Sequence, residues 1–100
     1  MNNIAFVQAR MGSSRLPGKV MMRCGDLPLI HILLQRLAKS KKIDKIVVAT
    51  SNSKEDKILI NYIKKIGFST FAGSKNNVVD RIYKAAKKFN AKNVIRITGD

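Results

Sequence analysis

The chain has 100 residues, of which 45% are apolar and 26% charged, a composition that suits one small globular domain, or part of one, and not a disordered segment. No apolar run approaches the roughly 20 residues that a membrane span needs, and no signal peptide is recognisable, so we expect a cytoplasmic chain without a membrane partner. The single cysteine, Cys24, excludes an intrachain disulfide and a zinc site of several cysteines. The formal net charge of +14 favours anionic partners, among them nucleotides and nucleic acid.

Compact apolar runs bounded by polar or turn residues are predicted to be buried parallel strands. They cover residues 4–7, 46–49, 68–71 and 94–97. Three stretches with helical spacing of apolar residues lie between them: one begins near Pro28, one is predicted to be capped by Ser53 with Asp56, and one carries its apolar stripe over residues 78–89. This order predicts a three-layer α/β/α fold with a mainly parallel sheet.

The loop after the first strand, residues 8–19, is rich in groups that bind phosphate. It holds two glycines, two serines and three cations. Glycines let backbone N–H groups approach an anion, and Arg10, Arg15 and Lys19 can neutralise its charge. The loop therefore predicts a phosphate site, with a basic surface loop of no function as the alternative.

Two common phosphate motifs do not fit this loop. A P-loop has four residues between its glycines, whereas Gly12 and Gly18 enclose five, and Val20 stands where a magnesium-binding hydroxyl is needed. The three glycines of the dinucleotide fingerprint are also missing.

The last strand, residues 94–98, is predicted to be central in the sheet, and Gly99 and Asp100 follow it directly. Ligands of open α/β sheets bind at the carboxyl ends of the strands. Asp100 therefore lies where a ligand or a metal ion is expected.

Four blocks of sequence together resemble one family. They are residues 8–19 (QARMGSSRLPGK), residues 45–50 (KIVVAT), Gly73-Ser74 with residues 78–81 (VVDR), and residues 96–100 (RITGD). The blocks are similar to those of the cytidylyltransferases of spore-coat and other surface-polysaccharide synthesis, relatives of the CMP-KDO and CMP-sialate synthetases. The resemblance runs over essentially the whole chain, and family members continue beyond it into a sugar-binding half.

The resemblance implies a Rossmann-like fold of the nucleotide-diphospho-sugar transferase type, with residues 1–100 as the N-terminal, nucleotide-binding part of a truncated single domain. It implies that CTP and a sugar or sugar acid are the substrates, that Arg10 and Lys19 are catalytic, and that Asp100 holds Mg²⁺. The nucleotide-binding residues that it implies are Gln8, Ala9, Arg10, Gly12, Ser13, Ser14, Arg15, Lys19 and Arg96.

Two positions depart from the family pattern, since Ala72 stands where an arginine is common and Asn77 where an acidic residue is common. Contacts from this region to the base or sugar are therefore an open question. Asp80 and Arg81 are candidates either for the site or for an ion pair on a helix surface, which would contribute little to stability.

Alternative functions follow from the charge and from the short length. A basic nucleic-acid-binding domain fits the charge, but few aromatic residues are present for stacking on bases, and no recognition motif is found. A nucleotide-binding fragment or a pseudoenzyme without turnover is the second alternative. The sequence identifies no particular sugar and leaves a homodimer open.

Overall fold

A computed structural model describes residues 3–12 and 18–98. Its centre is a parallel sheet of four strands in the order β5-β4-β1-β6. The strands are β1 (Asn3–Gln8), β4 (Lys45–Ser51), β5 (Ser69–Gly73) and β6 (Asn93–Thr98). All four strands that the apolar runs predict are present.

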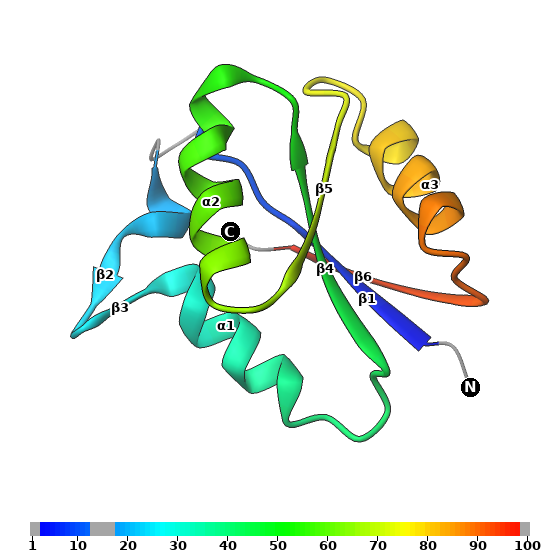
Figure 1. The fold of residues 1–100 in the computed structure, drawn as a ribbon, viewed down its shortest axis with the longest axis horizontal. Helices are drawn as coiled ribbons and strands as arrows, with labels where there is room; N and C mark the ends of the chain where they lie inside the picture. Colours follow the sequence, from blue (N-terminus) through cyan, green and yellow to red (C-terminus); the bar gives the residue numbers. More distant parts are fainter. Residues whose placement is uncertain (1–2, 13–17, 99–100) are drawn as a thin grey trace.

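Helices cover both faces of this sheet (Figure 1). The helices α1 (Leu29–Ala38) and α2 (Lys57–Lys65) lie on one side, and α3 (Val78–Lys88) lies on the other. The predicted three-layer α/β/α fold with a parallel sheet is thus confirmed. Within the described residues no helix is long and apolar enough to cross a bilayer.

Short elements join these layers. A one-turn 3-10 helix, η1 (Lys19–Met21), leads into a small antiparallel hairpin of β2 (Arg23–Cys24) and β3 (Leu27–Pro28), and a second, η2 (Lys54–Asp56), precedes α2. The hairpin was not predicted, because strands of two residues are too short to show an apolar pattern.

Alternating side chains of the strands divide the core into two clusters, one on each face of the sheet. On β1, Ala5 and Val7 pack toward α1 and α2, whereas Ile4 and Phe6 pack toward α3. Because both faces of β1 and β4 are buried, their sequences are continuous apolar runs instead of alternating ones.

One expectation about local structure, the cap of α2, is corrected by the structure. The predicted cap of α2 by Ser53 and Asp56 is wrong, because neither side chain makes a capping hydrogen bond there. Asn77, in contrast, caps α3, since its Oδ1 accepts from the N–H of Asp80 at 2.9 Å.

The strand β6 lies at an edge of the sheet within the described residues, where it pairs with β1 alone. The central position predicted for it is therefore not found in this part of the chain. Ile95 and Ile97 pack against the core on the α1 side, while Val94 remains 46% exposed.

Candidate functional site

The carboxyl ends of the four parallel strands meet at one edge of the sheet, and the predicted phosphate loop starts there. Gln8 ends β1, and the buried Ala9 donates its N–H to the carbonyl of Ala49 on β4 at 3.3 Å. The first residues of the loop are therefore an extension of the sheet, and their backbone direction is fixed by it.

A buried carboxylate anchors the next residue of the loop. Asp56 is fully buried at the end of η2, and its Oδ1 accepts the N–H of Met11 at 2.7 Å. Its Oδ2 accepts the hydroxyl of Ser51, the last residue of β4. A carboxylate that accepts two hydrogen bonds inside the protein is well compensated for its burial, so Asp56 holds the loop to β4.

Gly12 is packed against the neighbouring residue of η2. A Cβ atom at this position would lie 2.8 Å from Oε1 of Glu55, a distance that real Cβ atoms do not reach. The same Oε1 is 3.3 Å from Nζ of Lys75, which follows β5. The loop, η2 and the β5–α3 connection therefore lie together at this edge of the sheet.

On the α3 face, Arg81 is 1% exposed although it belongs to a mainly polar helix. Its Nη1 donates to the carbonyl of Ser74 at 3.0 Å, and its Cγ would lie 3.0 Å from a Cβ at Gly73. Among the described residues its Nε has no hydrogen-bond partner. The alternative that Asp80 and Arg81 form a surface ion pair is wrong, because Arg81 is buried and Asp80 pairs with Lys84 at 3.2 Å instead.

The charges of two further arginines, Arg10 and Arg96, act on Arg81. Burial lowers the pKa of Arg81, the charge of Arg10 lowers it further, Asp56 raises it, and Arg96 lowers it. Arg96 lies on β6 and donates from Nε and Nη2 to Oε1 of Gln8 at 3.2 and 3.1 Å. Arg10 and Arg96 thus act on Arg81 as like charges, and Asp56 acts on it as the opposing carboxylate.

Lys19 lies on the other side of the sheet's edge. It lines a cavity of about 340 Å³ with Arg36 of α1 and Thr98 at the end of β6. Leu29, Ile32, Leu33 and Cys24 complete the lining. The cations of the predicted site therefore form two groups, Arg10 with Arg81 and Arg96 on the α3 face, and Lys19 with Arg36 on the α1 face.

Four of the predicted site residues lie outside the described residues. They are Ser13, Ser14, Arg15 and Asp100. The structure brings Gln8, Arg10 and Arg96 together, and it places Ala9 and Gly12 in the same loop. In the described part of the chain, no three His, Cys, Asp or Glu side chains form a group that could hold a metal ion.

Sequence reasoning missed the role of Asp56, and it left Arg81 open between a residue of the site and a surface ion pair. Asp56 is 45 residues away from Met11 in the chain, so no local pattern indicates their hydrogen bond. For Arg81 a signal was present, because the residue lies three positions after Val78 and directly before the buried Ile82, beside the apolar stripe of the helix.

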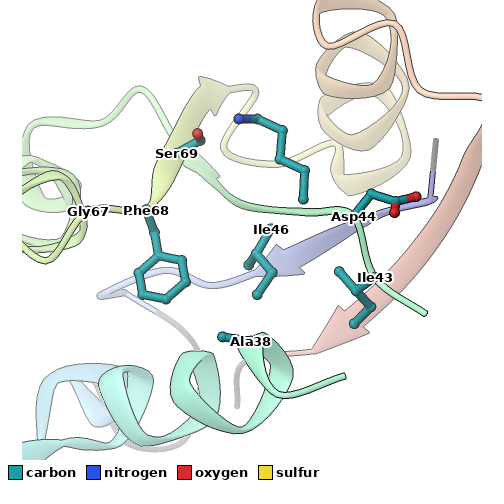
Figure 2. Close-up of a pocket in the computed structure, with 8 residues that line it drawn as sticks. Ala38, Ile43, Asp44, Ile46, Gly67, Phe68 and Ser69 are labelled. Carbon is teal, nitrogen blue, oxygen red and sulfur yellow. The ribbon is translucent and has the colours of Figure 1, made fainter. Parts of the chain in front are cut away.

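A second hollow lies at the opposite, amino end of the strands (Figure 2). It measures about 250 Å³, and Ile43, Ile46 and Phe68 form much of its lining. None of the predicted site residues lines it.

Comparison with known proteins identifies a family for this chain, and the relatives found belong to the same family or share its fold. The model of a family described as Cytidylyltransferase matches residues 4–100. The spore coat polysaccharide biosynthesis protein SpsF of Bacillus subtilis is 44% identical over 105 residues, which cover all of this chain and 44% of that protein.

Two solved structures have the same fold. One, a cytidylyltransferase from Leptospira borgpetersenii, superposes with a TM-score of 0.94 at 40% identity, over all of this chain and 42% of the other. The other, CMP:2-keto-3-deoxy-manno-octonic acid synthetase complexed with CTP, has a TM-score of 0.84 at 24% identity, over all of this chain and 41% of the other. The chain thus spans about two fifths of the length of these relatives.

Proposed function

The chain belongs to the cytidylyltransferase family, and on this premise we propose that the protein it represents transfers CMP from CTP to a sugar or sugar acid. In this reaction an oxygen of the sugar attacks the α-phosphorus of CTP. The bond from that phosphorus to the bridging oxygen breaks, and pyrophosphate leaves. We expect the product to serve polysaccharide or glycan synthesis, as the name of the relative from Bacillus subtilis suggests for that protein.

The observation that carries this proposal is the fixed loop at the carboxyl end of the sheet. Two hydrogen bonds, from Ala9 to Ala49 and from Met11 to Asp56, set the backbone direction at the start of the loop. Cations preset around a site stabilise the charge that develops on the leaving pyrophosphate at little reorganisation cost. Arg10 and Lys19 are the two cations that we assign to this task.

CTP is the nucleotide that we propose, because the CMP:2-keto-3-deoxy-manno-octonic acid synthetase of similar fold was solved with it. The remaining nucleotide-binding residues of the proposal are Gln8, Gly12 and Arg96 with Ala9, Ser13, Ser14 and Arg15.

Mg²⁺ is the cofactor that we propose, with Asp100 as its carboxylate ligand. The donor chemistry fits, because Mg²⁺ prefers anionic oxygen ligands together with substrate phosphates. When bound, the ion would neutralise charge on the phosphate oxygens. In the sequence, Asp100 comes two residues after the end of β6, and β6 pairs with β1, the strand after which the loop starts.

Pyrophosphate release tests the proposal. We would assay a protein that carries this chain within the full length of its relatives, with each of the four common nucleoside triphosphates, Mg²⁺ and a panel of sugars and sugar acids. Release with CTP and one class of sugar is the expected result. CTP binding without release under every condition would favour a nucleotide-binding protein without turnover, and a preference for another nucleotide would contradict the assignment to CTP.

A further inference from the structure

We propose that the open edge of β5 is a docking site for an extended, acidic segment of a partner protein, which adds to the sheet as a further strand. The strand β5 is the last strand on its side of the sheet, and among the described residues it pairs with β4 alone. None of the predicted site residues that the structure describes lines the groove along this edge. The surface is therefore separate from the phosphate loop, and its role does not depend on the transfer of CMP.

A groove of about 660 Å³ follows the edge of β5. Residues 69–72 of the strand form its floor, Lys64 at the end of α2 lines one side, and Lys88 at the end of α3 lines the other. The two helices lie on opposite faces of the sheet, with β5 between them (Figure 1). An extended segment in this groove would therefore lie beside β5, in the place of a neighbouring strand.

The backbone of β5 offers hydrogen bonds to such a segment. A strand at the edge of a sheet directs some of its N–H and C=O groups to its one neighbour and the others away from it. Because β4 is on one side, the remaining groups of β5 face the groove. Addition of a strand at an open edge is a common way to bind an extended peptide, since main-chain hydrogen bonds supply the affinity.

The charge of the groove indicates an acidic segment. Two lysines and no acidic residue line it in the described chain. Nζ of Lys88 lies 5.8 Å from the ring centre of Phe71 and 6.0 Å from that of Phe89, so the aromatic rings hold this ammonium group beside β5. Neither Lys64 nor Lys88 pairs with a carboxylate of the described residues. Because successive side chains of a strand point to opposite faces, carboxylates at neighbouring positions can reach both lysines.

A second copy of this chain suits the groove less well than an acidic segment does. The formal net charge is +14, and pairing of two β5 edges would bring the lysines of both copies together. The same two lysines that protect the edge against self-pairing attract an acidic strand.

Compensation of the helix dipole does not account for these two lysines. A cation in the last turn of a helix stabilises it, and Lys64 and Lys88 both lie in such turns. Lys65 and Lys87 lie in the same two turns and do not line the groove. The dipoles are thus served without a cation beside the open strand, whereas an acidic partner requires one there.

The test uses a fluorescein-labelled peptide of about ten residues, within the length of ordinary strands. It is built from Val, Thr and paired Glu, so that a strand of it carries carboxylates on both faces. Fluorescence polarisation measures its affinity for a protein that carries this chain within the full length of its relatives. The double variant Lys64→Gln with Lys88→Gln removes both cations of the groove. The matched control, Lys65→Gln with Lys87→Gln, removes the neighbouring exposed cation from the same turn of each helix.

The wild type and the control variant should bind the peptide equally well. The double variant of Lys64 and Lys88 should bind it about 3- to 20-fold more weakly, the range expected for two solvated ion pairs. A peptide with Gln in place of Glu should lose a similar factor. A peptide with Pro at its centre keeps the charge but cannot continue the strand, and it should bind at least about tenfold more weakly. Hydrogen exchange of the amides in residues 69–73 should slow when the parent peptide is bound.

Three results would overturn the proposal. Absence of binding to the wild type would mean that the edge is closed to an added strand. Equal affinity for the parent peptide and the Pro peptide would show that the groove attracts any polyanion, as would displacement of the peptide by a single-stranded oligonucleotide of the same charge. A dimer that dissociates when the peptide binds, measured by analytical ultracentrifugation, would assign the edge to a second copy of the chain.

Discussion

The two ends of the sheet use polar side chains in opposite ways. At the amino end, Asn3 makes three hydrogen bonds. Its backbone N–H donates to Asp44 at 2.7 Å, and its side-chain amide donates to the carbonyl of Lys42. The Oδ1 of Asn3 accepts from the side-chain amide of Asn93. At the carboxyl end, the Nε of Arg81 has no partner in the described chain, and the charges of Arg10 and Arg96 both act on Arg81 as like charges. Polar groups that satisfy one another hold the fold, whereas cations left without a counter-charge are available to a ligand.

Both ends of the sheet have a cavity, and they differ in their buried polar atoms without a hydrogen-bond partner. The amino end has a cavity of about 250 Å³, lined by Ile43, Ile46 and Phe68 together with polar residues such as Asp44 and Ser69 (Figure 2). The carboxyl end has the cavity of about 340 Å³ beside Lys19. Two buried side-chain atoms have no hydrogen-bond partner in the described residues. Oγ1 of Thr50 lies in the carboxyl half of β4, and Nε of Arg81 lies on α3 beside the end of β5. Unpaired buried groups are therefore the better guide to the site.

The largest loss of stability is expected for replacement of Asp56, the buried carboxylate at the carboxyl end of the sheet. Asp56→Ala should lower the free energy of unfolding by about 3 to 5 kcal/mol, because the N–H of Met11 and the hydroxyl of Ser51 would lose their acceptor. Urea denaturation followed by circular dichroism measures the loss. Asp56→Asn, which retains one oxygen acceptor, should lose less. Equal midpoints for Asp56→Ala and the wild type would show that the loop is held by other contacts.

The next effect concerns activity at the same end. In a protein of the relatives' full length, Lys19→Ala should cost about 2 to 4 kcal/mol of transition-state stabilisation, as removal of a preset donor does in other enzymes. The matched control is Lys41→Ala, which removes an exposed cation near the amino end. The ratio of kcat/KM between variant and wild type measures the cost. Similar losses in the two variants would remove the functional distinction between the two ends.

A smaller effect is expected at the amino end, where the polar contacts are structural and exposed. Asp44→Ala removes the acceptor of the Asn3 N–H and should lower the free energy of unfolding by about 0.5 to 1 kcal/mol. CTP affinity should stay as in the wild type, and calorimetry checks this. A loss of CTP affinity without a loss of stability would contradict the structural role of this end.

The sequence predicts much of the fold because burial on both faces of β1 and β4 imposes continuous apolar runs, and burial of one face of a helix imposes its spacing. It also predicts a phosphate site in the loop of residues 8–19, since that chemistry is local. Contacts between distant segments could not be predicted in this way. Asp56 fits a helix cap by local rules. In the structure its carboxylate instead accepts the N–H of Met11, which is 45 residues away in the chain.

The smallest effect on stability is expected for Lys84, which lies on the same helix, α3, as Arg81. Lys84 lies three residues after Arg81, but its side chain is 62% exposed and its Nζ is 3.2 Å from Oδ2 of Asp80. A solvated pair of this kind contributes only about 0.3 to 0.5 kcal/mol, and salt screens it. Lys84→Ala should therefore lower stability by no more than this, and the difference should disappear in roughly 0.5 M salt.

A double-mutant cycle of Lys84→Ala with Asp80→Ala isolates the energy of the pair from other effects of each substitution. CTP affinity provides the second measurement, and Lys84→Ala should leave it unchanged, because this cation has a partner and faces solvent. A clear loss of CTP affinity in Lys84→Ala would mean that the charge of α3 as a whole attracts the nucleotide.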